Sequence, residues 1–459
     1  MNALWRAPAH QLASMIRAGR CTSREVVLAH LERADLVNNQ INAVTAVLRE
    51  QALAAADAFD ARGDRALPLG GVPFSVKESV DVAGSATTLG VPRAARQLAT
   101  SDAPIVERLK AAGAIPLFRT NMSEMGMRLH TTNPLRGATV NPWRADRTPG
   151  GSSGGDAAAV ATGMVPFGVG NDVGGSLRSP AYCCGVMALK PTAGRIPHAS
   201  SLPPRDHGLA TQLMLVQGIL ARSVDDLSLT LTACAGRHRR DPRSIDAPLV
   251  GPAAPKVAGV VTQAGGRRLD THTLAGVHGA ARRLRDAGWR VEEIALPELE
   301  RVHEVWGVIF SDDLKATLPS LTPLLSVPLH GYLKAVLGSF HASLTTYEAH
   351  VERSRLARLW SALFARCPVV LCPTWTCPPW PPDADLGADG VERVAKTATF
   401  LLPASLLGFP SLALPIGEIE ETPTGVQVMA DLWREDLCLQ AGADIARQGI
   451  LATPIDPLG

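Results

Sequence analysis

Two short glycine-framed serine motifs constrain the fold of this chain more than any other feature of its sequence. The first, 150–155, is Gly-Gly-Ser-Ser-Gly-Gly and runs directly into the alanine-rich segment 156–161. Glycine permits backbone conformations and close approaches that residues with a Cβ forbid. By spacing alone the motif fits either a flexible linker or a structural turn. The strong helix former that follows at once, with Asp156 in its first turn, favours a tight turn at a functional site.

The second motif, 168–176, ends in Gly174-Gly175-Ser176. Consecutive glycine amides just before a serine can direct N–H groups at the oxyanion that forms when this serine attacks a carbonyl group. The motif lacks the glycine spacing of a dinucleotide or phosphate loop. It therefore predicts an acyl-transfer site rather than a nucleotide site.

Segment 151–155 also fits the G-x-S-x-G elbow of α/β-hydrolases, in which Ser153 would be the nucleophile. That elbow requires a strand immediately before it. Residues 141–149 contain two prolines and are expected to form a loop. The elbow is therefore the weaker of the two alternatives.

Lys77 lies in segment 71–84, where the residues on both sides of it are mostly apolar. Most lysines are solvated and charged. A lysine drawn into the end of an apolar strand loses its hydration, its pKa falls, and its neutral amine can accept a proton. A serine hydrolase without a histidine base requires such a group, and the twelve histidines form no arrangement that competes with it.

Short apolar runs alternate with helical segments along the chain, which predicts an α/β fold built on a layered sheet. A capping box from Thr22 to Glu25 is expected to open a helix, and a βαβ unit is expected within 257–294. The expected strands are 72–76, 115–118, 165–169, 257–261, 289–294, 369–371, 411–414 and 425–430. The expected helices are 9–18, one opening at 22, 50–62, 104–112, 157–162, 273–286, 298–317, 343–366 and 435–447, with a surface connection over 235–255.

Composition excludes several classes of protein. The formal net charge is +2 and hydrophobic residues make up 46% of the chain, so neither a nucleic-acid partner nor a membrane surface is indicated. The uncharged stretch 397–417 is broken by three prolines and is expected to form buried strands and turns. Residues 1–20 have no signal-peptide pattern. Eight cysteines are too sparse for a disulfide scaffold and lack zinc spacing, which fits reduced thiols. We therefore expect a cytoplasmic protein without a metal.

Together these segments resemble the amidase signature family. The resemblance extends over nearly the whole chain, and its matching stretches are 71–84, 113–124, 132–143, 147–195, 220–226 and 408–417. It implies one large α/β domain, 1–459, in which a mixed central sheet is covered by helices on both faces. It also implies N-terminal helices at about 1–65 and a variable helical region for substrate specificity at about 298–366.

The resemblance implies a role for each motif residue. Ser176 would be the nucleophile, Ser152 a bridging serine preceded by a cis peptide, and Lys77 the base. Arg178 and Asp172 would support the loop rather than react. The oxyanion hole would be formed by the backbone amides of Val173, Gly174, Gly175 and Ser176. The implied reaction is hydrolysis of an amide-type bond through an acyl-enzyme, with no cofactor and no metal.

A few positions depart from the family pattern. Asp156 stands where a small residue is commoner, Glu78-Ser79 replaces the usual Asp-Asn, and Ala188 stands where glycine is usual. None of them is one of the three implied catalytic positions. They put the shape and polarity near the site in doubt, not the chemistry.

Substrate specificity in this family is set largely outside the signature motifs. Flexible thioethers and aromatic rings line adaptable apolar sites, although ordinary core packing explains the same residue types. The candidate pocket residues are Met122, Met125, Met127, Ser153, Trp306 and Phe310, and a wider apolar channel would add Leu324, Leu325, Leu333, Leu337 and Phe340. This apolar set favours a neutral, hydrophobic or aromatic amide, or a related ester or carbamate, as the small-molecule substrate of a monomer or homodimer.

Two alternatives remain at this point. The glutaminase component of a tRNA-dependent amidotransferase belongs to the same family, but segment 196–207 differs from the tyrosine-glycine-leucine continuation of that component. A catalytically silent binding protein with the same fold is disfavoured because all three implied catalytic positions are filled. A hydrolysis screen and labelling of the nucleophile separate these alternatives.

Overall fold

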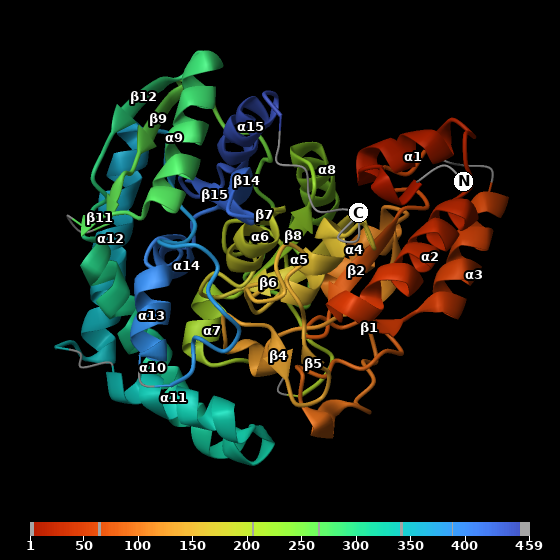
Figure 1. Cartoon of the computed structure of the whole chain (residues 1–459), viewed down its shortest axis with the longest axis horizontal. Coiled ribbons are helices and arrows are strands. Elements are labelled where there is room, and N and C mark those ends of the chain that lie inside the picture. Colours follow the sequence, from red (N-terminus) through yellow and green to blue (C-terminus); the bar gives the residue numbers. More distant parts are fainter. Residues whose placement is uncertain are drawn as a thin grey trace.

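A mixed β-sheet runs through the molecule and carries helices on both faces (Figure 1). The computed structural model describes residues 4–62, 66–203, 206–264, 267–339, 343–387 and 389–449. Within these residues the sheet has eleven strands. In sheet order they are β1 (Val44–Val47), β3 (Ile115–Thr120), β2 (Pro73–Lys77), β6 (Phe167–Asp172), β8 (Val216–Ala221), β7 (Met187–Lys190), β14 (Ser411–Ile419), β15 (Thr422–Met429), β13 (Val369–Pro373), β9 (Val257–Val260) and β12 (Arg290–Glu293).

Strand direction changes across the sheet. β2 is parallel to both β3 and β6, whereas the strands from β6 through β8, β7, β14 and β15 to β13 are antiparallel. β13, β9 and β12 are again parallel. Two small antiparallel pairs lie outside the main sheet: β4 (Thr132–Asn133) with β5 (Gly137–Ala138), and β10 (Gln263–Ala264) with β11 (Arg267–Arg268).

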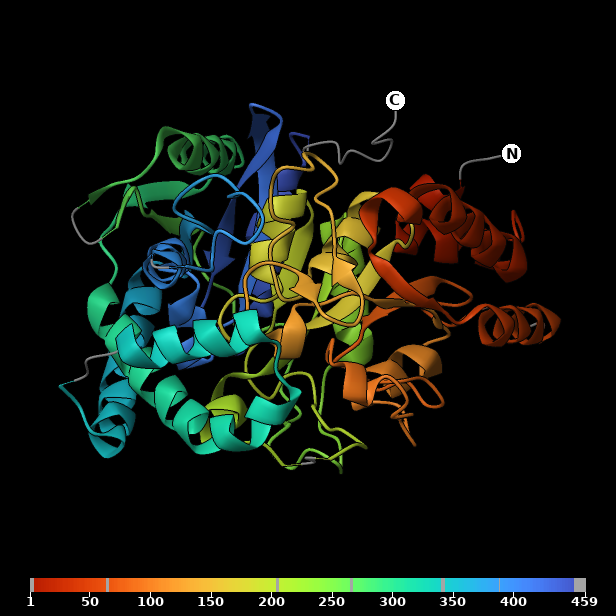
Figure 2. The same ribbon diagram turned by 60° about the horizontal axis from the view of Figure 1, so that its bottom comes forward.

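Helices cover the sheet and extend beyond it. The first group is α1 (Ala9–Arg17), α2 (Ser23–Ile41), α3 (Arg49–Ala61), α4 (Pro104–Ala111), α5 (Gly154–Ala161), α6 (Arg178–Cys184), α7 (Leu209–Met214) and α8 (Val224–Cys234). The second is α9 (Thr271–Asp286), α10 (Leu299–Leu321), α11 (Val327–Ser339), α12 (Thr346–Arg366), α13 (Gly390–Thr397), α14 (Leu402–Leu407) and α15 (Glu435–Ala446). Short 3₁₀ turns are η1 (Leu4–Arg6), η2 (Pro92–Ala94), η3 (Glu124–Gly126) and η4 (Thr322–Leu324). Figures 1 and 2 place α10–α12 at the opposite end of the molecule from α1–α3.

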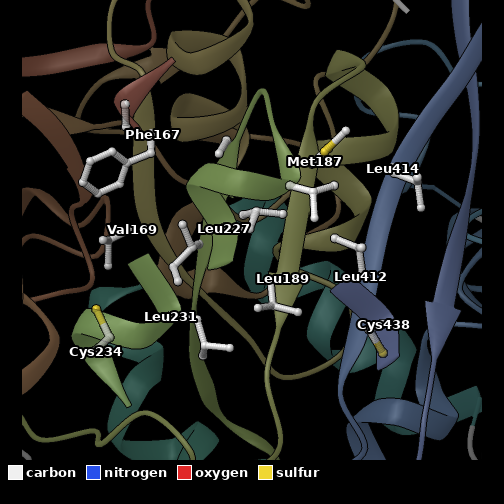
Figure 3. Close-up of a cluster of buried hydrophobic side chains, with 14 of the residues drawn as sticks. Phe167, Val169, Met187, Leu189, Leu227, Leu231, Cys234, Leu412, Leu414 and Cys438 are labelled. Atoms are coloured by element: carbon white, nitrogen blue, oxygen red, sulfur yellow. The ribbon is translucent and has the colours of Figure 1, made fainter. Parts of the chain in front are cut away.

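The two faces of β2 meet different parts of the core. Phe74 and Val76 belong to the large cluster that α8 and α15 cover. Figure 3 shows part of this cluster, with Phe167, Val169, Met187, Leu189, Leu227, Leu231 and Leu412 labelled. Because side chains alternate along a strand, Ser75 and Lys77 point to the other face, where α5 lies with its alanines in a second cluster.

Much of the predicted architecture is confirmed. The capping box forms as expected, because Thr22 accepts a hydrogen bond from the Glu25 amide and Glu25 accepts one from the Thr22 amide. The βαβ unit forms from β9, α9 and β12, with its two strands parallel. The mixed sheet with helices on both faces is also present.

Several elements differ from the expectations. Those that no expected segment covers include β7, β8, α6, α7, α8 and α13. β1 lies inside the region expected to be helical, where it pairs with the edge of β3. α11 is not among the expected helices, and it precedes the expected helix at 343–366. The uncharged stretch 397–417 contains a helix, α14. Its Pro403 is tolerated because it occupies the first turn, where a missing N–H costs nothing.

Among the helices of the described ranges, none combines the length and the apolar character that a membrane span needs.

Candidate active site

Lys77 ends strand β2 and is fully buried. Its Nζ donates hydrogen bonds to Ser152 Oγ at 2.7 Å and to Asn171 Oδ1 at 2.7 Å. Asn171 belongs to the neighbouring strand β6 and Ser152 to the first glycine-framed motif. The parallel pairing of β2 with β6 therefore brings residues that are far apart in sequence to one point.

The protonation state of Lys77 is set by its surroundings. Burial lowers the pKa of its ammonium group to about 7, although the negative charges of Asp156 and Asp172 act in the opposite direction. Removing an ammonium group from water disfavours its charged form. At neutral pH a substantial fraction of Lys77 is therefore a neutral amine that can accept a proton.

The first glycine-framed motif is a buried turn rather than a flexible linker. The Gly151–Ser152 peptide bond is cis, and the Ser152 carbonyl accepts a hydrogen bond from the Ser123 amide at 3.2 Å. A Cβ added to Gly151 would lie 2.5 Å from the carbonyl oxygen of Arg128. Glycine is required there because backbone approaches it so closely.

Ser176 lies in the turn between β6 and α6 and is 9% exposed. Its carbonyl oxygen accepts a hydrogen bond from the Ser153 amide at 3.1 Å. This bond joins the two glycine-framed motifs. Its donor, Ser153, directly follows Ser152 in the first motif, and its acceptor, Ser176, ends the second. The structure thus brings Lys77, Ser152 and Ser176 into one neighbourhood.

The backbone amides before Ser176 are not equivalent. The Gly175 amide donates to Asp172 Oδ1 at 2.7 Å, and the Leu177 amide donates to Asp172 Oδ2 at 3.1 Å. In the described part of the chain, the amides of Val173, Gly174 and Ser176 have no protein acceptor. Those three N–H groups are therefore available to a ligand, whereas Gly175 helps to hold the loop.

Asp172 and Arg178 form a buried ion pair, 3.0 Å between Oδ1 and Nη2. Burial alone would raise the pKa of Asp172, but the charge and hydrogen bonds of Arg178 bring it down to about 2. Arg178 also donates to the Leu401 carbonyl and to the side chains of Gln427 and Ser405. The pair therefore ties the loop 173–176 to α14 and β15.

Asn171 is a site residue that sequence reasoning missed, and Ser79, noted only as a departure from the family pattern, is bonded to it. Asn171 accepts from Lys77, and its Nδ2 donates to Ser79 Oγ at 2.9 Å. This chain of bonds fixes which Asn171 atom faces the lysine. An asparagine at a strand end carries no signature of its own, and only its position directly before Asp172 could have drawn attention to it.

The predicted pocket residues divide into two groups. Trp306 and Phe310 of α10 stack with centroids 4.7 Å apart, and a Cβ on Gly174 would lie 3.2 Å from the Trp306 ring. Phe310, Met125 and Met127 all pack against the apolar cluster formed by α10 and α11. Phe310 therefore links Trp306, beside the loop 173–176, to the apolar cluster against which the two methionines pack.

The second group is buried in the protein. Met122 is 1% exposed and Ser153 is fully buried, with its hydroxyl facing the Asn171 carbonyl at 3.5 Å. The structure does not bring these two to a surface, and their contact with substrate stays a prediction. Of the wider channel set, Leu325, Leu333 and Leu337 pack in the cluster of α10 and α11, while Phe340 lies outside the described residues.

Comparisons with known proteins cover most of the chain. A family model described as Amidase matches residues 25–439. An indoleacetamide hydrolase from Bradyrhizobium diazoefficiens is 38% identical over 98% of this chain and 88% of its own length. A component of the glutamyl-tRNA(Gln) amidotransferase of Acidothermus cellulolyticus is 32% identical over 96% of this chain and 94% of its own. A solved 6-aminohexanoate cyclic dimer hydrolase complexed with substrate has a TM-score of 0.82 and 27% identity, covering 99% of this chain and 100% of that chain.

Proposed function

Because this chain belongs to the amidase signature family and is an amide-hydrolysing enzyme, we propose that Ser176 is its nucleophile, Ser152 its bridging serine and Lys77 its base. The 2.7 Å hydrogen bond between Lys77 Nζ and Ser152 Oγ carries this proposal. The buried lysine has a pKa of about 7, and the Ser153 amide joins the two serine loops. In this proposal a base, a relay hydroxyl and a nucleophile hydroxyl act in that order.

The reaction proceeds in two halves. Neutral Lys77 takes a proton from Ser152, Ser152 takes one from Ser176, and the Ser176 oxygen forms a bond to the amide carbonyl carbon. When the tetrahedral intermediate collapses, the carbon–nitrogen bond breaks and the relay returns the proton to the leaving amine. A water molecule then attacks the acyl-enzyme by the same relay and releases the carboxylic acid.

The oxyanion is held by backbone amides of the loop 173–176. The N–H groups of Val173, Gly174 and Ser176 have no acceptor in the described part of the protein, which supports their assignment. Gly175 is the fourth residue of the predicted oxyanion hole, but its amide donates to Asp172. It therefore helps to fix the shape of the loop rather than to bind the oxyanion. Donors of this kind each contribute about 3 to 4 kcal/mol of transition-state stabilisation.

We propose an arylacetamide as the preferred substrate. The apolar surface of Trp306, Phe310, Met125 and Met127 offers contact to a flat, uncharged acyl group and no charge to a polar one. The similarity to an indoleacetamide hydrolase supports the same class. Esters and carbamates with the same aromatic group would form equivalent covalent intermediates, and the helical region 298–366 would supply the specificity.

A hydrolysis screen tests this proposal. Indole-3-acetamide and phenylacetamide should be cleaved with a higher kcat/KM than acetamide, anilides or glutamine, and p-nitrophenyl phenylacetate should also be cleaved. Glutamine is the second candidate substrate, because the glutamyl-tRNA(Gln) amidotransferase component is similar over most of this chain. A clear preference for glutamine would contradict the arylacetamide assignment.

Trp306→Ala should lower kcat/KM for phenylacetamide about 10- to 100-fold, since an aromatic contact of this size contributes about 1 to 3 kcal/mol. The value for acetamide should change little. Trp306→Phe should retain most of the activity, because the indole N–H has no acceptor in the described part of the chain. Tyr347→Ala, at an aromatic residue 78% exposed on α12, is the matched control. Equal losses for both amides would contradict a pocket role.

A further inference from the structure

Asp156, in the first turn of α5, is a fully buried carboxyl group that the mechanism above does not use. Its Oδ1 accepts a hydrogen bond from Ser75 Oγ at 2.8 Å. A Cβ on Gly168 would lie 2.9 Å from Asp156 Oδ1 and 2.6 Å from Ser75 Oγ, so the absence of a side chain at 168 leaves the space that this carboxyl group occupies.

The carboxyl group lies on the same face of β2 as the lysine base. Ser75 and Lys77 are alternate residues of that strand, so their side chains point to the same side. Phe74 and Val76 point to the opposite side, into the large core cluster. The Ser75 hydroxyl therefore places Asp156 one side chain along the strand from Lys77.

Two other carboxylates have cationic partners of their own: Asp172, whose charge also acts on Lys77, and Glu78, the next residue along the chain. Asp172 is paired with Arg178 at 3.0 Å, and Glu78 is paired with Arg136 at 3.0 Å. Part of the charge of each carboxylate is therefore balanced by an arginine, which weakens its action on the lysine.

Asp156 is held differently from those two carboxylates. Arg119 of β3 also faces it, but the Nη2 of Arg119 donates to the carbonyls of Lys77 and Val80. The hydrogen bond that Asp156 accepts comes from a hydroxyl group and not from a cation. Asp156 and Asp172 both favour the ammonium form of Lys77, and the effect of Asp156 is the larger of the two.

We propose that Asp156 is a positioning residue whose carboxylate stabilises the protonated form of Lys77 and so sets the lower end of the pH range in which the enzyme works. The inference rests on the proposed role of Lys77 as the base. It deepens that role, because Asp156 acts through the lysine and touches neither substrate nor nucleophile.

The sign of the effect follows from the charges. Burial raises the pKa of Asp156 to about 6, while the hydroxyl groups of Thr120 and Ser75 and the charge of Lys77 act in the opposite direction. Above that pH the carboxylate is ionised and favours the ammonium form of Lys77. Removing the charge lowers the pKa of Lys77, so its amine becomes neutral, and active, at a lower pH.

The experiment measures kcat/KM against pH for the wild-type enzyme and for Asp156→Asn, which keeps an oxygen for the Ser75 hydroxyl. The acidic limb of the profile should move to lower pH by about one unit, as expected for loss of one nearby charge. Asp156→Ser, with a smaller side chain, should move it in the same direction and serves if the asparagine variant does not fold. Circular dichroism establishes the fold of each variant.

Asp226→Asn is the matched control. Asp226 is also fully buried, but it accepts hydrogen bonds from the backbone amides of Ala9 and His10 at the start of α1. Removing its charge should therefore leave the acidic limb of the kcat/KM profile unchanged. An unchanged limb, or one displaced to higher pH, in the folded Asp156 variants overturns the inference. A wild-type enzyme whose Ser176 forms no covalent adduct overturns the proposed function itself, which distinguishes the two failures.

Discussion

Replacing Lys77 with alanine is expected to lower kcat for a primary amide by about 10³- to 10⁴-fold at neutral pH. General base catalysis contributes a factor of this size, and the variant loses both the acceptor of the Ser152 proton and the donor that returns it to the leaving amine. An ester with a p-nitrophenolate leaving group should lose less activity, because that group departs without a proton. Steady-state rates on paired amide and ester substrates measure the difference.

The pH dependence gives a second test of the same residue. The pKa of Lys77 is about 7, so wild-type kcat/KM should fall below that pH as the amine becomes protonated. The residual activity of Lys77→Ala should lack this limb. Lys77→Met keeps most of the buried aliphatic stem and should behave like the alanine variant. Lys110→Ala changes an exposed lysine paired with Asp102 and should behave like the wild type. A near-normal amide rate in folded Lys77→Ala would refute the base assignment.

Arg178→Leu is expected to lower the free energy of unfolding by about 3 to 5 kcal/mol at pH 7, because it leaves the Asp172 carboxylate buried without its charged partner. In the wild type the pKa of Asp172 is about 2, below its unfolded value, so its stabilising effect is present above about pH 4 and is lost as the pH falls toward 2. In the variant, burial raises this pKa instead. The difference in unfolding free energy between the wild type and Arg178→Leu should therefore increase from about pH 4 to pH 7.

Urea denaturation of both proteins at pH 4.5 and pH 7.5 measures that difference. Arg24→Leu removes one partner of an exposed pair, 2.6 Å from Asp57, and should change the unfolding free energy by about 0.5 kcal/mol or less. A pH-independent difference for Arg178→Leu would contradict the role given to the buried carboxylate. A loss as small as that of the Arg24 variant would contradict the importance of the pair for the loop 173–176.

The sequence predicts elements whose signals are local. The Thr22–Glu25 capping box and the βαβ unit of 257–294 each lie within one continuous segment, and both are present in the structure. The sheet order is not local, because β7 pairs with β14 across more than two hundred residues. β1 escapes prediction because a four-residue strand between two helices depends on the edge of β3 for its hydrogen bonds.

The site could be predicted only in part for the same reason. Lys77 has a local signal, an apolar strand around a lysine, and its burial follows that pattern. Asn171 has none, and Asp156 stands out only as an acid where a small residue is commoner. The importance of both comes from the pairing of β2 with β6 and from α5 on the same face of the sheet. Trp306 sits beside Gly174 only because α10 packs against that loop.

The most direct test of the central claim, that Ser176 is the nucleophile of a lysine-based relay, is covalent labelling of the folded enzyme with a fluorophosphonate, followed by mass spectrometry of its peptides. A single adduct on Ser176 is expected, formed far more slowly in Lys77→Ala and absent in Ser176→Ala. An adduct on Ser152 or Ser153, or an active enzyme that remains unlabelled, would contradict it.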